Sequence, residues 1–347
     1  MKILKIVLAC LTLIIGFVIY TIQSTGFFRT IENRFDGNYL KSIDIVGAED
    51  MQIDYEEGFV LISSDDRADR RDGNPGRGAI YKMDLNDLVL EPQRLPSTYR
   101  GKFNPHGIYM KKLSDSVHRL WVVNHVRSVH SIEVFDLRND SLMHLRSHRD
   151  ATMISPNDVV ALDADRFYYT NDHGNVKGFS RILEDYGGLR ASNVGYFDGK
   201  EFRQVADGIA YANGINYDSD RNLLFVASPR GFLVKVYNVL SSGDLDHIED
   251  IDCSTGVDNI AFDEQGKIWI GAHPSLLDYS SYSQAKREIA PSEIITIDYR
   301  GESDYAVESI YLEEGAKMSG ATVAVPYNNL IFVGNVMDDH FLVLQRD

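Results

Sequence analysis

Cysteine is nearly absent from this sequence, which holds only Cys10 and Cys253 among 347 residues. Cys10 falls inside a long apolar run near the N-terminus, so the rest of the chain has no second thiol with which Cys253 could form a disulfide. No general base lies near Cys253, and we interpret it as a small hydrophobic residue rather than a nucleophile. The fold must therefore be stabilised by packing and hydrogen bonding.

Basic residues are also scarce. There are 35 Lys and Arg against 51 Asp and Glu, which gives a formal net charge of -16. This surplus of negative charge repels the phosphate backbone of nucleic acids, so we expect no nucleic acid partner. Only 9 residues are proline, whereas 44% are hydrophobic and 11% aromatic, a composition that excludes a disordered or collagen-like chain.

Several common motifs are incomplete. The segment 178–182 (GFSRI) lacks the final glycine of a serine-hydrolase nucleophile elbow. The segment 218–222 (DSDRN) begins like an EF-hand loop but lacks its later glycine and glutamate, so we predict a hairpin turn. The segment 65–78 contains several glycines, but no helix is predicted after it, as a phosphate-binding loop would require. We interpret this segment as a charged surface loop. His144 and His148 have helical metal-ligand spacing without a helical apolar stripe, and we predict a surface loop there too.

The first 22 residues differ from the rest of the chain. Lys2 and Lys5 precede an uncharged apolar run at 6–22, whose 17 residues are the lower limit for a transmembrane helix. Basic residues on this flank place the N-terminus in the cytoplasm and the bulk of the chain outside. We predict a signal anchor over 1–22 and a linker over 23–40. A cleaved signal peptide, giving a secreted protein, is the alternative, and a lipoprotein signal at Cys10 fits less well.

A polar cluster followed by two β-like runs occurs six times between residue 41 and the C-terminus. The polar clusters are 47–50, 104–107, 155–158, 211–214, 256–259 and 318–321. In four units the stronger apolar run ends 14 residues beyond the cluster. Six similar units at spacings of roughly 45 to 60 residues predict an all-β fold, a six-bladed β-propeller over 41–347.

In a propeller the first strand of each blade lines the central channel, so the six polar clusters should meet there. They supply mostly carboxylate and amide oxygens, from Glu49, Asp50, His106, Asn157, Asp158, Asn213, Asp258 and Asn259. An isolated asparagine in such a position usually caps a turn. A ring of asparagines with carboxylates instead predicts a metal site, because Ca²⁺ prefers six to eight oxygen ligands.

Seven short segments resemble the serum paraoxonase/arylesterase family in the same order and spacing. They are 103–108 (FNPHGI), 122–125 (VVNH), 156–159 (PNDV), 170–173 (TNDH), 212–216 (ANGIN), 257–260 (VDNI) and 271–274 (GAHP). The resemblance covers residues 43–347, and that family has a related uncleaved N-terminal hydrophobic segment. It implies a six-bladed propeller with two Ca²⁺ ions in its channel that hydrolyses lactones and aryl esters.

The same resemblance implies roles for individual residues. A catalytic Ca²⁺ would be bound by Glu49, Asn157, Asn213, Asp258 and Asn259. A structural Ca²⁺ would be bound by Asp50, Asp158 and the backbone carbonyl of Ile108. His106 and His125 would form a catalytic dyad, with His173 and His273 in the substrate wall. A hydrogen bond from His125 would make His106 a better base for activating water, and Glu49 or Asp258 is an alternative base.

The chain also departs from this family. The animal enzymes join their two ends by a disulfide, whereas here we expect the ring to close by pairing of an N-terminal strand with 340–346. The segments 65–72 and 176–195 are more charged than their apolar counterparts, which weakens the expectation of lipid-particle docking or of lipophilic lactones. We predict a short helix in 175–199, inserted between blades three and four.

These observations predict a membrane-anchored, extracytoplasmic, Ca²⁺-dependent hydrolase whose partner is a small-molecule ester or lactone. Two alternatives are a non-hydrolytic propeller like the strictosidine-synthase-like proteins and a Ca²⁺-stabilised propeller that binds a partner without turnover. The ligand ring and the histidine dyad together favour hydrolysis. The sequence indicates no particular oligomeric state.

Overall fold

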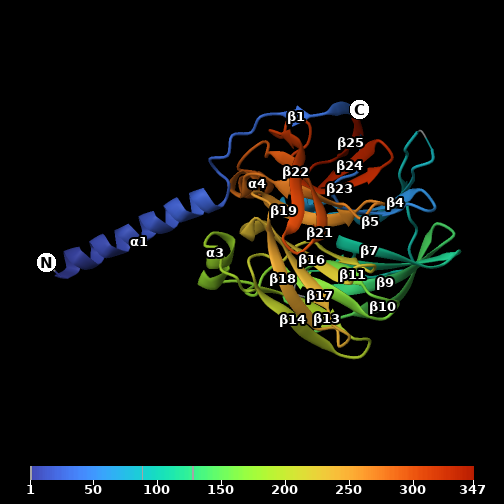
Figure 1. Ribbon diagram of the computed structural model, residues 1–347, viewed down its shortest axis with the longest axis horizontal. Coiled ribbons are helices and arrows are strands. Elements are labelled where there is room, and N and C mark those ends of the chain that lie inside the picture. Colours follow the sequence, from blue (N-terminus) through green and yellow to red (C-terminus); the bar gives the residue numbers. More distant parts are fainter. Residues whose placement is uncertain (1, 88, 127–128) are drawn as a thin grey trace.

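The structure is a computed structural model that describes residues 2–87, 89–126 and 129–347. It confirms a six-bladed β-propeller preceded by an apolar helix, α1 (Lys2–Ser24), which extends away from the propeller (Figure 1). Shorter helical elements are α2 (Arg67–Arg71), α3 (Phe179–Asp185), η1 (Pro229–Gly231) and α4 (Leu276–Ser283). Each of these four lies between the second and third strands of its blade, so they gather at one end of the channel.

Each blade is an antiparallel sheet whose strands follow one another outward from the channel. Blades one to three are β3 (Ala48–Asp54), β4 (Phe59–Asp65), β5 (Gly78–Asp84), β6 (Gln93–Arg94); β7 (Pro105–Ser114), β8 (Val117–Asn124), β9 (Ser131–Arg138), β10 (Ser141–His148); and β11 (Pro156–Ala161), β12 (Phe167–Asn171), β13 (Ser192–Phe197), β14 (Phe202–Ile209). Blades four to six are β15 (Ile215–Asp218), β16 (Leu223–Ser228), β17 (Leu233–Val239), β18 (Leu245–Asp252); β19 (Gly256–Phe262), β20 (Ile268–His273), β21 (Ser292–Gly301), β22 (Asp304–Glu313) with β1 (Arg34–Phe35) at the edge; and β23 (Ala321–Tyr327), β24 (Leu330–Asn335), β25 (Phe341–Arg346) with β2 (Gly37–Ile43).

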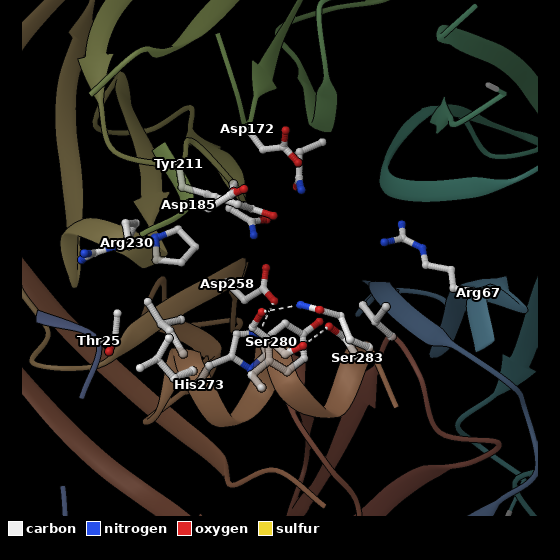
Figure 2. Close-up of a pocket in the computed structure, with 18 of the residues that line it drawn as sticks. Thr25, Arg67, Asp172, Asp185, Tyr211, Arg230, Asp258, His273, Ser280 and Ser283 are labelled. Carbon is white, nitrogen blue, oxygen red and sulfur yellow. Dashed lines mark hydrogen bonds and ion pairs between the residues drawn. The ribbon is translucent and has the colours of Figure 1, made fainter. Parts of the chain in front are cut away.

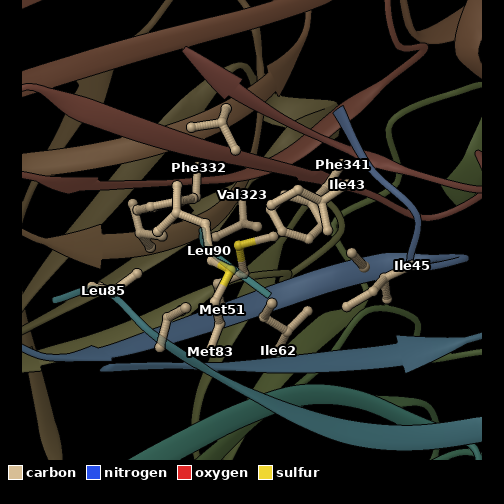
Figure 3. Packing of buried hydrophobic residues seen from close by; sticks show 14 of the residues in the cluster. Ile43, Ile45, Met51, Ile62, Met83, Leu85, Leu90, Val323, Phe332 and Phe341 are labelled. Atoms are coloured by element: carbon tan, nitrogen blue, oxygen red, sulfur yellow. The ribbon is translucent and has the colours of Figure 1, made fainter. Parts of the chain in front are cut away.

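The ring closes where the two ends of the chain meet. β2 pairs antiparallel with β25, from Gly37 opposite Arg346 to Ile43 opposite Phe341, which confirms the predicted pairing. β1 and the start of β2 lie within the segment predicted as a linker. Between blades one and six lies an apolar cluster, the closure seam, shown in Figure 3. Its buried residues are Ile43, Ile45, Ala48, Met51, Val60, Ile62, Met83, Leu85, Leu90, Ala261, Val323, Val325, Phe332, Phe341 and Val343.

Irregularities in the innermost strands coincide with the polar clusters. The pairing register shifts between Ala48 and Asp50, Pro105 and Ile108, Pro156 and Val159, Val257 and Ile260, and Ala321 and Val323. A β-bulge releases a residue from regular alternation and re-aims its side chain. The polar residues inside these bulges are thereby freed from the ladder at the end of five inner strands, whereas β15 pairs with β16 without a shift.

The end of α1 is fixed to the propeller rather than joined to it by a free linker. The Arg230 guanidinium donates to the carbonyl oxygens of Ser24, at 3.0 Å, and of Tyr186, at 2.8 Å. Arg29 forms two hydrogen bonds of 2.6 and 2.7 Å to the buried carboxylate of Glu293. α1 is long and apolar enough to cross a membrane, with a mean hydropathy of 2.6, and a signal sequence would meet the same criteria.

Three local predictions were wrong. α3 lies between β12 and β13, so the predicted insertion is within blade three and not between blades three and four. The segment 65–78 contains α2, which begins where the Asp66 carboxylate caps the Asp69 N–H. His144 and His148 lie on β10, not in a loop. β10 is the outermost strand of its blade, and its outer edge makes only a short parallel bridge between Leu142 and Ser97 among the described residues. It therefore lacks the continuous apolar run of an inner strand.

Candidate active site in the channel

Five of the six polar clusters contribute to the lining of a cavity of about 360 Å³, at the end of the channel where α2, α3, η1 and α4 gather; the cluster at 318–321 does not. The predicted site residues that line it are Glu49, His106, His125, Asn157, Asn213, Asp258 and His273. Asn259 is buried beside them, and its Nδ2 donates to Glu49 Oε1 at 3.0 Å. In Figure 2, Arg67 reaches toward the cavity from the side opposite Asp258 and His273.

Three buried amide oxygens at this site have no hydrogen-bond partner among the residues that the structure describes. They are Asn157 Oδ1, Asn213 Oδ1 and Asn259 Oδ1, and they come from blades three, four and five. Glu49, from blade one, adds a buried carboxylate whose Oε2 lies 2.8 Å from His106 Nδ1. Leaving a buried polar atom unpaired costs about 1–3 kcal/mol, so three in one place call for a ligand that compensates. Amide and carboxylate oxygens are the ligands that Ca²⁺ prefers.

The ionisable groups at the site also favour a bound cation. Burial raises the pKa of Asp258, against the opposing effect of His273. Burial would also raise the pKa of Glu49, but the neighbouring His106 and Arg67 bring it below its ordinary value. Several carboxylates held out of water repel one another, and a bound cation removes that cost.

The residues predicted for a structural Ca²⁺ are buried and have partners. Asp50 Oδ2 accepts the Ile108 N–H at 2.7 Å, and Asp158 Oδ2 accepts the Ile215 N–H at 2.8 Å. Each carboxylate thus ties the inner strand of one blade to the next. A Cβ on Gly107 would lie 2.4 Å from Asp158 Oδ1, which explains the glycine. Burial raises the pKa of both carboxyl groups, and their mutual repulsion raises that of Asp50 further.

The His106 and His125 rings meet edge to face, with their centres 4.8 Å apart. Within the described residues no hydrogen bond joins them, and the buried Nε2 of His125 has no partner. Burial lowers the pKa of His125 well below its ordinary value. His106 Nδ1 faces two groups, Glu49 Oε2 at 2.8 Å and the Arg67 guanidinium. One ring nitrogen cannot donate to the first and accept from the second, so the two contacts select opposite tautomers.

The two predicted wall histidines differ. His273 lines the cavity and contacts Asp258 Oδ2 through Nε2 at 2.8 Å. His173 is fully buried behind the wall, with Nδ1 2.6 Å from Asp172 and Nε2 2.8 Å from Asp185. Burial would lower the pKa of His173, but these carboxylates raise it to about 9. His173 is therefore a cation at neutral pH that fixes Asp172, a residue of the cavity lining.

Sequence reasoning missed residues that line the cavity from the connections between strands. Arg67 comes from α2, in the segment predicted to be a surface loop. Tyr279 comes from α4 and stacks on His273, with ring centres 3.7 Å apart and planes 14° apart. The serine cap of α4 at Ser275 is a helix-start signal that would have identified this short helix.

Comparisons with known proteins agree with the resemblance found in the motifs. The sequence model of one family, described as Arylesterase, matches residues 28–342. The chain is 33% identical over 308 residues to serum paraoxonase/arylesterase 1 of Homo sapiens, covering 86% of each protein. It is 34% identical over 265 residues to serum paraoxonase/arylesterase 2 of Gallus gallus, covering 75% of this chain and 74% of the relative. A solved luciferin-regenerating enzyme shares the fold, with a TM-score of 0.55 at 11% identity over 87% of this chain and 91% of that one.

Proposed function

Because the chain belongs to the arylesterase family, we propose that it is a Ca²⁺-dependent hydrolase of aryl esters and lactones. Its substrate would be a small molecule that enters the channel cavity, and the reaction class is carboxylic ester hydrolysis. α1 would anchor the protein with the propeller on the extracytoplasmic side. Thr25, which follows α1 directly, lines the cavity, so the opening would lie close to the anchor.

One observation carries the proposal: three buried oxygens from three blades, without partners among the described residues, converge beside a cavity lined by three histidines and by carboxylates that include Glu49 and Asp258. Glu49, Asn157, Asn213, Asp258 and Asn259 would hold the catalytic Ca²⁺, and Asp50, Asp158 and the Ile108 carbonyl a second, structural ion. When bound, the catalytic Ca²⁺ would polarise the ester carbonyl and stabilise the negative charge that develops on its oxygen.

The chain's own residues would move the proton. His106 lines the cavity and would accept a proton from the attacking water, with His125 packed on its ring. Glu49 or Asp258 is the alternative base, because each also borders the cavity. His273 and Tyr279 would form one face of the substrate wall, and the stacked pair keeps the imidazole beside Asp258.

The test is hydrolysis of phenyl acetate and of a γ- or δ-lactone, with and without a chelator. We expect chelation to abolish activity and added Ca²⁺ to restore it. Asn259→Ala and His106→Gln should each lower kcat/KM by about 100-fold while circular dichroism stays unchanged. Asn38→Ala, at an exposed position on β2, is the matched control and should be fully active. Hydrolysis that chelation does not affect would refute Ca²⁺ chemistry.

A further inference from the structure

A third histidine stands beside the predicted dyad. His130 packs edge to face against His125 with ring centres 4.9 Å apart, nearly the 4.8 Å that separates His125 from His106. The hairpin geometry explains this arrangement. Asn124 and Ser131 are paired across β8 and β9, so His125 and His130, the next residues toward the turn, face each other. Three imidazoles therefore form a row that starts in the cavity and ends at the partly exposed His130.

The middle and outer rings of this row, His125 and His130, each carry a nitrogen without a partner among the described residues. His125 Nε2 and His130 Nδ1 are buried, and neither has a hydrogen-bond partner within the described part of the chain. One bridging water would satisfy both and would provide a path for a proton. Burial lowers the pKa of both rings, so each is neutral at pH 7 with one donor and one acceptor. Among the described residues, the charged and titratable groups that face them are Arg67 and His106, beside His125, and Asp172, which faces both.

Ester hydrolysis leaves a proton to be removed. The water oxygen bonds to the acyl carbon, the acyl C–O bond breaks, the leaving oxygen takes one proton to become an alcohol, and the acid ionises to a carboxylate. One proton per turnover must reach solvent, and a substrate that fills the cavity blocks the direct route from His125. We propose that His130 takes this proton from His125 and releases it to solvent, as the outer member of a three-histidine relay. This inference rests on the proposed function, because that reaction produces the proton.

The relay is tested by the dependence of turnover on buffer. In dilute buffer, His130→Gln should lower kcat about tenfold with KM unchanged, and added imidazole should restore the rate. His130→Phe, which keeps a ring in the packing position, should show the same loss and the same rescue. The matched control is His247→Gln, another solvent-accessible histidine on the outer strand β18, which should behave as wild type.

Three results would overturn the relay. The first is a His130→Gln rate equal to wild type in dilute buffer, and the second is a loss that imidazole does not rescue, which would mark a packing role. The third comes from a double-mutant cycle. If the three histidines act as a unit, adding His130→Gln to the His125→Gln variant should lower kcat little further. Additive losses of kcat would contradict the relay. A wild-type protein inactive on every ester and lactone would refute the proposed function itself, whereas an active one indifferent to His130 would refute only the relay.

Discussion

The closure seam and the channel are both buried, but the seam is apolar whereas the channel is lined by polar groups. In the seam, apolar side chains from blades one and six pack together beside the β2–β25 ladder. In the channel, three amide oxygens have no partner among the described residues. Met51, in the seam, and Glu49, in the channel, are two residues apart on β3. A single inner strand therefore contributes one residue to the apolar seam and, two positions away, another to the candidate site.

Removing a seam side chain should have the largest effect on stability. Phe341 is fully buried on β25, opposite Ile43 of β2. Phe341→Ala should lower the free energy of unfolding by about 3–5 kcal/mol, because it deletes a large apolar group and leaves a cavity. Urea denaturation measures this, and Phe179→Ala, at an exposed position on α3, is the control that should change little. Activity of the folded fraction should be retained; its loss would contradict the separation of the two regions.

Removing a channel charge should instead act on Ca²⁺. Glu49→Gln keeps the shape of the side chain but loses the negative charge that would face the ion. We expect Ca²⁺ binding to weaken by about 100-fold, which is about 3 kcal/mol, in calorimetric titrations. Asp218→Asn, in a hairpin turn of blade four, is a carboxylate control away from the channel and should bind Ca²⁺ normally. Equal affinity in the Glu49 variant and the control would remove this residue from the ligand set.

The fold was predictable because its signal is local and repeated: each blade has a polar cluster followed by an apolar run. The channel residues were predictable for the same reason, since they sit at fixed positions before those runs. Arg67, Tyr279 and His130 were not, because they come from connections between strands. The path of a connection depends on what it packs against rather than on its own periodicity, and the sequence of α2 alone gives no sign that it borders the channel.

A polar group beside the channel that does have partners should stabilise the fold, in contrast to the unpaired oxygens. His173 has a pKa raised to about 9 by Asp172 and Asp185. A raised pKa means that its contribution is complete below about pH 6.5 and is lost as pH rises through 9. With Ca²⁺ saturating, the free energy of unfolding should fall by roughly 2–3 kcal/mol over that range. His173→Gln should flatten the profile, and an unchanged slope in that variant would contradict this account.

The smallest expected effect tests directly whether buried polar atoms without partners destabilise the metal-free protein. Asn213 Oδ1 is buried and has no partner in the described part of the chain. The side chain of Asn171, also buried, accepts from the Ser155 N–H and donates to the Thr152 carbonyl. Leucine has nearly the shape of asparagine, so the two Asn→Leu substitutions differ mainly in the hydrogen bonds they remove.

Without Ca²⁺, Asn213→Leu should raise the free energy of unfolding by about 1 kcal/mol and Asn171→Leu should lower it by a similar or larger amount, because only the second breaks satisfied hydrogen bonds. Urea midpoints of the chelated proteins measure both changes. With Ca²⁺ added, Asn213→Leu should gain less stability than wild type, since it has lost an oxygen that would bind the ion. If both variants were destabilised alike in chelator, the Asn213 oxygen would already be satisfied in the metal-free protein. The polar residues of the channel would then be explained by hydrogen bonding within the fold rather than by cation binding.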